Sequence, residues 1–87
     1  MDLLELEKNV MQICGVSDLN GRKIEKVYAR TIIFVELKKQ GYSLYDISDM
    51  CKTDYQNVAY LIRQFDDRVK YDKEFKNLVD IYYGDKR

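Results

Sequence analysis

The chain has 87 residues, and its 15 Lys and Arg balance its 15 Asp and Glu. This length fits one compact domain, residues 1–87, and is too short for two. A hydrophobic content of 46% is too high for a disordered chain, and a charged content of 34% is too high for a membrane protein. Histidine is absent, which excludes Ser-His-Asp and Cys-His catalysis and every His-ligated metal site. We therefore expect a protein that is not an enzyme and has no cofactor.

The sequence also indicates a compartment. No apolar stretch approaches the ~20 residues that span a bilayer, and the N-terminus, MDLLELEK, has acids where a secretory signal needs bases. Cys14 and Cys51 form no CxxC pair, so we expect two reduced thiols that behave as small apolar side chains. A disulfide between them is the less favoured alternative. We expect a cytoplasmic protein with no membrane partner.

Apolar residues at helical spacing and the absence of proline predict an all-α fold, a small orthogonal bundle of five helices. The first helix is expected to begin after Asp2, with Glu5 at the capping-box position, and to end at Gly15. The second and longest helix is expected over residues 22–40. The buried stripe expected on this long helix comprises Ile24, Val27, Tyr28, Thr31, Phe34 and Val35.

Polar residues predict the starts of the remaining three helices. Ser43, with Asp46 at the capping-box position, is expected to begin the third helix, and Asp54 the fourth. Asp72 is expected to begin the fifth, which should close before Gly84. The residues expected to face inward from these helices are Leu44, Ile47, Cys51, Val58, Leu61, Ile62, Phe65, Phe75, Leu78, Val79 and Tyr82.

Residues 43–65 have the pattern of a helix-turn-helix, which needs a short helix, a tight turn and a second helix that crosses the first. The small Ser48 follows Ile47 where the helices should meet, and Lys52 and Thr53 form the turn. Lys52 occupies the position that usually holds glycine, so we expect it to adopt a left-handed backbone at a cost of about 1 kcal/mol.

In a helix-turn-helix, the outward face of the second helix enters the major groove of DNA. That face offers Tyr55, Gln56, Asn57, Tyr60 and Arg63. Gln and Asn side chains bind adenine edges, and Arg binds guanine. The alternative is a solvated helix face that simply carries polar residues.

Overall neutrality conceals one basic segment. Residues 21–40 contain six Lys and Arg against two Glu, a local charge of +4. Phosphate binding depends on such a local stripe more than on net charge. The basic residues of this segment are Arg22, Lys23, Lys26, Arg30, Lys38 and Lys39.

The order of motifs from Val10 to Tyr82 resembles the C-terminal DNA-binding domain of the bacterial replication initiator DnaA. The resemblance is carried by a helix that ends in GVS (15–17), the basic pair at 22–23 and AR (29–30) in the long helix. It continues through SLxDI (43–47), DxxxV (54–58) and DxxF (72–75). The family is all-α, contains a helix-turn-helix and binds short DNA boxes at replication origins.

The resemblance implies roles for particular residues. Arg22 corresponds to a basic-loop arginine that enters the minor groove, and Arg30, with Lys38 or Lys39, to phosphate contacts. Residues 54–57 correspond to the base-reading signature D-H-T-T, of which only the Asp is kept, so a different DNA target is implied. The residues expected to contact DNA are Arg22, Lys23, Lys26, Arg30, Lys38, Lys39, Asp54, Tyr55, Gln56, Asn57, Tyr60 and Arg63.

Two functions remain open from the sequence. The first is double-stranded DNA binding linked to replication initiation or its regulation, in a nucleoid-associated protein whose modest affinity calls for a homodimer or a partner. The second is a protein-interaction module on the same scaffold, because eight tyrosines exceed what five small helices need for a core. Adjacent carboxylates such as Asp66 and Asp67 are typical of solvated helix faces and do not indicate catalysis.

Overall fold

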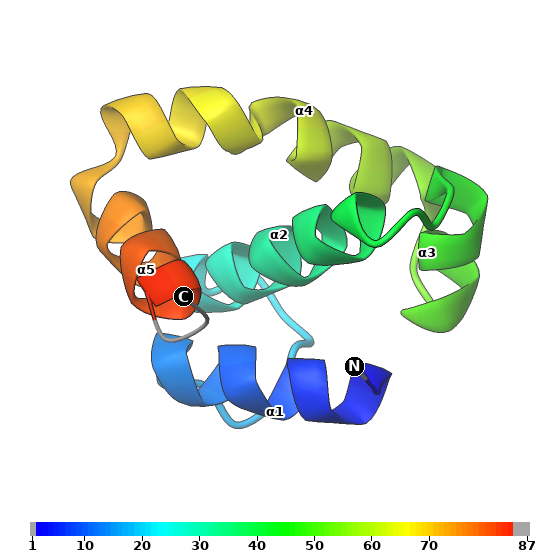
Figure 1. Ribbon diagram of the computed structural model, residues 1–87, viewed down its shortest axis with the longest axis horizontal. Coiled ribbons are helices and arrows are strands. Elements are labelled where there is room, and N and C mark those ends of the chain that lie inside the picture. Colours follow the sequence, from blue (N-terminus) through cyan, green and yellow to red (C-terminus); the bar gives the residue numbers. More distant parts are fainter. Residues whose placement is uncertain (1, 85–87) are drawn as a thin grey trace.

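The computed structural model describes residues 2–84, and all regular structure in that range is helical (Figure 1). The helices are α1 (Leu3–Cys14), α2 (Ile24–Lys39), α3 (Leu44–Met50), α4 (Tyr55–Tyr71) and α5 (Lys73–Gly84). The prediction of an all-α bundle of five helices is confirmed for these residues. None of the helices in residues 2–84 is both long and apolar enough to cross a bilayer.

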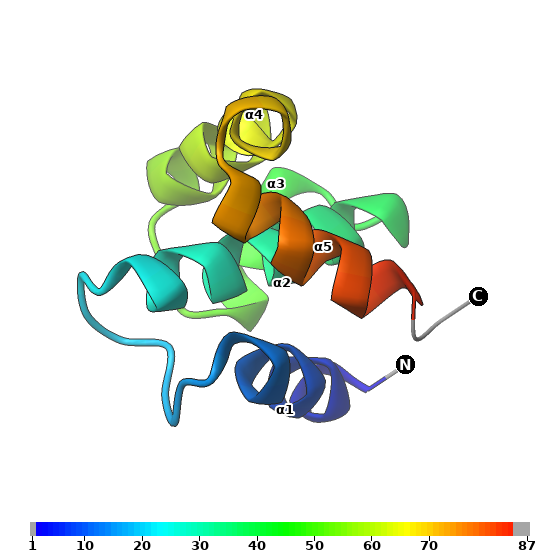
Figure 2. The same cartoon turned by 90° about the vertical axis from the view of Figure 1, so that its left-hand side faces the viewer.

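The long helix α2 is the centre of the bundle and contacts α1, α3 and α4 (Figures 1 and 2). Because neighbours cover it on several sides, its buried residues are not confined to one stripe. Ala29, Ile32 and Leu37 are buried although they lie outside the predicted stripe. The prediction that Ile24 is buried is wrong. Ile24 is the first residue of α2, and its side chain is 42% exposed.

The predicted helix caps differ in outcome. Ser43 and Asp46 form the predicted capping box, with two reciprocal hydrogen bonds of 3.1 Å. Asp2 and Asp54 precede α1 and α4 as expected, but neither side chain makes a capping hydrogen bond, so the capping box between Asp2 and Glu5 is wrong. For α1 and α4, the start of the helix was therefore predicted better than the contact expected to cap it.

The bounds of α2 and α5 also depart slightly from expectation. Helix α2 begins at Ile24 rather than at residue 22, so Arg22 and Lys23 belong to the loop before it. The Asp72 carboxylate accepts a hydrogen bond from the Phe75 amide at 3.2 Å and so caps α5 as predicted. Helix α5 includes Gly84 instead of closing before it.

A four-residue connection joins α3 to α4. Cys51 is the C-cap of α3, and Lys52 has a φ of 53°, the one positive φ at a non-glycine residue within residues 2–84. The left-handed backbone expected at Lys52 is therefore confirmed. Ile47 on α3 and Val58 on α4 are both fully buried, so the two helices are locked together through the core.

An aromatic cluster fixes the α4–α5 corner on α2. The Phe75 ring lies 5.1 Å from the Tyr28 ring and 5.8 Å from the Phe65 ring, between centroids. The Tyr28 hydroxyl donates to the Asp72 carboxylate at this corner. These contacts hold the C-terminal part of α4 and thereby set the direction in which its N-terminal part projects.

Both cysteines are free thiols, as expected. Cys14, the last residue of α1, is buried in the core, and Cys51 is partly buried just after α3. Burial raises the pKa of each thiol to about 11, so both are protonated at neutral pH.

Candidate nucleic-acid interface

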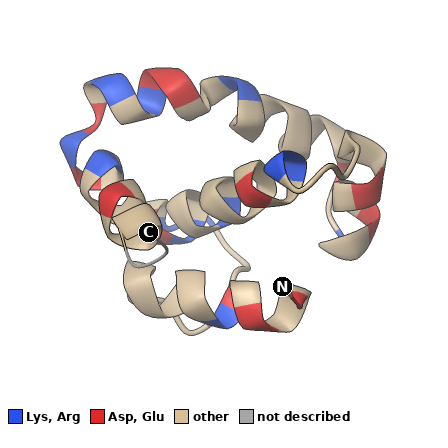
Figure 3. Cartoon of the chain, viewed as in Figure 1, with Lys and Arg blue, Asp and Glu red and all other residues tan. Residues whose placement is uncertain are grey.

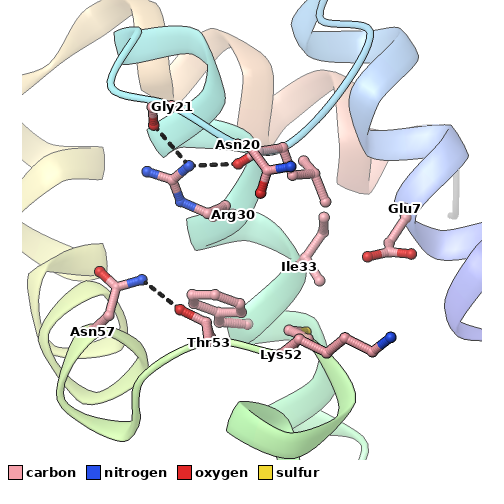
Figure 4. Close-up of a pocket in the computed structure, with 11 residues that line it drawn as sticks. Glu7, Asn20, Gly21, Arg30, Ile33, Lys52, Thr53 and Asn57 are labelled. Atoms are coloured by element: carbon pink, nitrogen blue, oxygen red, sulfur yellow. Dashed lines mark hydrogen bonds between the residues drawn. The ribbon is translucent and has the colours of Figure 1, made fainter.

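The loop before α2 lies beside the start of α4, on one side of the molecule (Figures 2 and 4). A cavity of about 170 Å³ separates them. Leu19, Asn20 and Gly21 line it from the loop, Arg30 from α2, and the turn residues 52–53 with Asn57 from the α3–α4 unit. The fold thus brings together the two segments that the sequence singled out, the basic loop and the α4 helix.

Arg30 bridges α2 and the loop. Its Nη1 donates to the carbonyl oxygen of Leu19 and, at 3.0 Å, to that of Gly21. Its Nε is buried and has no hydrogen-bond partner within residues 2–84. The guanidinium group is therefore held under the loop rather than extended into solvent (Figure 4).

Lys26, one turn earlier on α2, is also occupied by the loop. Its Nζ forms a 2.8 Å ion pair with Asp18 and donates to the Asn20 carbonyl at 2.7 Å. The Asp18 carboxylate also accepts from the Asn20 amide at 2.9 Å. The hydrogen bond from Lys26, followed by that from the Asn20 amide, lowers the pKa of Asp18 below its ordinary value.

Arg22 and Lys23 are the exposed cations of the loop. Neither makes an ion pair with any residue in the range 2–84. Lys23 lines a shallow surface hollow with Gly15 and Ser17, on the side of α1. Arg22 directly follows Gly21, which lines the cavity that faces α4, but Arg22 itself does not line it.

The outward face of α4 forms one wall of an open groove. Gln56, Tyr60 and Arg63 line it at helical spacing and are all exposed, Tyr60 by 52%. Lys38, from the end of α2, lines the same groove. The apolar part of the lining consists of Leu44, Tyr55, Ala59 and Ile62. This groove holds most of the polar side chains expected on α4.

Asn57 and Lys39 lie away from this groove, although their neighbours in the sequence, Gln56 and Lys38, line it. Asn57 points into the cavity beside the loop, and its amide nitrogen donates to the Thr53 hydroxyl at 3.2 Å. Lys39 packs 4.2 Å above the Tyr83 ring and donates to its hydroxyl at 3.0 Å. Lys39 therefore covers α5 instead of joining Lys38.

A pair of stacked tyrosines lies at the junction of α3 and α4. The rings of Tyr45 and Tyr55 are 4.4 Å apart between centroids, with an angle of 28° between their planes. Tyr45 is 69% exposed, so the stack presents a broad aromatic surface next to the groove. Sequence spacing did not predict this pairing, because the two residues belong to different helices.

Acidic residues lie on α3, just before α4 and, as Asp66 and Asp67, in the second half of α4, whereas the first half of α4 has none (Figure 3). Asp46 and Asp49 are exposed on α3, and Asp54 is exposed just before α4. The Asp46 carboxylate is partly occupied by its hydrogen bond to the Ser43 amide. From residue 55 to residue 65 the only charged residue is Arg63.

The cavity adds residues that the sequence did not single out as candidates for the site. Lys52 and Thr53 line it from the turn, Asn20 from the loop and Glu7 from α1. No motif or spacing signals these residues, because their proximity comes from three separate segments. Within residues 2–84, no group of three or more Cys, Asp or Glu side chains is arranged to hold a metal ion.

No protein-family model, no curated protein and no solved structure matches this chain. The resemblance to the DnaA C-terminal domain therefore rests on the sequence motifs alone.

Proposed function

We propose that this chain binds double-stranded DNA, with α3 and α4 acting as a helix-turn-helix and the loop before α2 contacting the adjacent groove. In this proposal the outward face of α4 enters the major groove, where Gln56 and Arg63 read base edges. Tyr60 contacts a thymine methyl or a phosphate. Arg22 reaches the minor groove from the loop.

One observation carries the proposal: loop residues 19–21, which directly precede Arg22, and Asn57 near the start of α4 line the same cavity. Two elements that contact neighbouring grooves must lie close together on the protein, and the loop and the start of α4 do. The uncharged or basic character of α4 between residues 55 and 65 supports the same reading, because carboxylates there would repel phosphate.

Salt dependence tests the proposal. Lys26, Arg30 and Lys39 have intramolecular partners, which leaves Arg22, Lys38 and a few neighbours to meet phosphates. With about three to four phosphates neutralised, log K against log salt should have a slope of about −2.7 to −3.6. The measurement is fluorescence anisotropy against random and origin-type duplexes at several salt concentrations. Binding that is absent at low salt, or insensitive to salt, would refute DNA binding.

Matched lysine and arginine variants locate the interface. Arg63→Ala, on the outward face of α4, should weaken binding by about 1–3 kcal/mol for a preferred duplex. Lys73→Ala is the control. Lys73 is exposed and begins α5, just past the C-terminal end of the 17-residue helix α4, away from the groove. Equal losses for the two variants would contradict the proposed orientation.

A protein partner is the second candidate, and the apolar lining of the groove favours it. Leu44, Ala59 and Ile62 line the groove next to the exposed ring of Tyr60. Exposed aromatic and apolar surface with few charges is typical of the centre of protein interfaces. If no duplex binds, we expect the groove to bind a protein partner instead. Tyr60→Ala should then abolish capture of that partner.

A further inference from the structure

We propose that Lys26 and Arg30 are positioning residues: they hold loop residues 18–22 against α2, and they do not contact phosphate. Their task is to present Arg22 beside the start of α4. The role in DNA binding rests on the proposed function, whereas the fixing of the loop can be tested in the free protein. The inference departs from the sequence-based expectation, in which both residues bind the DNA backbone.

The hydrogen bonds of Arg30 carry the first part of the argument. An arginine has five N–H donors, and both protons of Nη1 are directed at loop carbonyls, those of Leu19 and Gly21. Its Nε is buried and has no hydrogen-bond partner within the described residues. In a solvated arginine this group would be bound to water, so the side chain of Arg30 is inserted into the protein. A phosphate bound to this group would have to displace the loop.

Lys26 supplies the second part. Its ammonium group has two oxygen partners in the loop, at 2.8 Å on Asp18 and 2.7 Å on Asn20, and its side chain is only 19% exposed. A Cβ atom built on Gly21 would lie 3.6 Å from Lys26 Nζ, so the side chain also packs against the turn. Gly21 has a φ of 114°, a conformation that side chains other than glycine rarely adopt. Lysine and glycine thus shape this turn together.

The physical purpose of such contacts is preorganisation. Residues 15–23 form no helix, so a free loop would lose conformational freedom when it binds. Two cations on successive turns of α2 fix the loop by its carbonyl groups before any ligand arrives. Lys26 and Arg30 are anchored on the central helix, which contacts the other four helices, so the position of the loop is tied to the core.

The DNA arm of the test separates positioning from phosphate contact. Lys26→Met and Arg30→Met should weaken duplex binding about tenfold at fixed salt and leave the salt slope unchanged. Loss of a phosphate contact instead makes the slope shallower by about 0.9. Lys38→Met is the matched control, because Lys38 is exposed and lines the groove, and its slope should change by that amount. A shallower slope for Lys26→Met or Arg30→Met overturns the inference.

The second arm uses the free protein and trypsin, which cuts after Arg22 and Lys23. Lys26→Met and Arg30→Met should increase the rate of cleavage at these bonds at least about fivefold, whereas Lys38→Met should not. Lys26→Arg should restore the wild-type rate, because it keeps the charge that pairs with Asp18. Thermal melts of each variant identify any general loss of structure; if Arg30→Met does not fold, Arg30→Lys, which shortens the reach to the carbonyls, replaces it.

The two arms keep the two proposals apart. If the wild-type protein binds no duplex, DNA binding fails and the cleavage rates alone decide whether Lys26 and Arg30 fix the loop. If cleavage is unchanged in both Met variants, the positioning role is overturned even where duplex binding is strong.

Discussion

The turn between α3 and α4 contains a strained residue whose replacement should stabilise the protein. Lys52 has a φ of 53°, in the left-handed region, where a side chain brings Cβ close to the following carbonyl oxygen. Its side chain is exposed and forms no ion pair within residues 2–84, so little is lost when it is removed. Lys52→Gly therefore isolates the backbone cost of this turn.

The size of the effect follows from two opposing terms. The left-handed conformation costs a residue with a side chain roughly 1–2 kcal/mol, which glycine avoids. Glycine in turn gives the unfolded chain more freedom, at a cost of roughly 0.5–1 kcal/mol. We expect a net gain of about 0.5–1 kcal/mol in the free energy of unfolding, or an increase in Tm of roughly 2–8 °C for a domain of this size.

Urea denaturation and thermal melts of three proteins test this expectation. Lys52→Ala is the control, because alanine removes the side chain and retains the strain, so it should be no more stable than the wild type. A Lys52→Gly variant that is less stable than Lys52→Ala would refute the reasoning, since the left-handed backbone would then cost less than the freedom of glycine.

Three further predictions concern helix ends, pH and thiol reactivity. Gly15 has a φ of 71° and open space within 4 Å of the position that a Cβ would occupy, so Gly15→Ala should cost about 1 kcal/mol by backbone strain alone, measured by urea denaturation. The hydrogen bond from Tyr28 lowers the pKa of Asp72, so the stability that Tyr28→Phe removes should be largest above pH ~4 and shrink as the pH falls through the lowered pKa. Melts of both proteins from pH 7 to pH 2 check this, and a difference that grows on acidification would contradict it. Burial raises the thiol pKa of Cys14 and Cys51 from 9.0 to about 11. Iodoacetamide should therefore alkylate both thiols about 100-fold more slowly than an ordinary thiol at pH 8. Unfolding in urea should abolish the difference.

The sequence by itself determined the secondary structure and its local signals. Helix starts at Ser43, Asp54 and Asp72 were predictable because a short polar side chain before an apolar run is a local feature. The left-handed turn at Lys52 followed in the same way, because Lys52 occupies the turn position that usually holds glycine in a helix-turn-helix. Each of these features depends on residues within one or two turns of one another.

Tertiary structure decided the burial of α2. A helix with neighbours on several sides buries residues all around, so the periodicity of its sequence no longer identifies an inner stripe. Ala29 and Ile32 were missed for this reason, and Ile24 was wrongly placed inside because a position at a helix end has no neighbour to cover it.

Tertiary structure also decided which cations remain available to a ligand. Lys26, Arg30 and Lys39 look alike in the sequence, as basic residues of one segment. Their partners lie in the preceding loop or on α5, at separations with no fixed helical spacing. Ion pairs and hydrogen bonds across segments form only after the chain has folded, because the fold alone determines which oppositely charged or polar groups meet. Residue type therefore identified the candidates, and three-dimensional proximity separated those engaged within the protein from those that face outward.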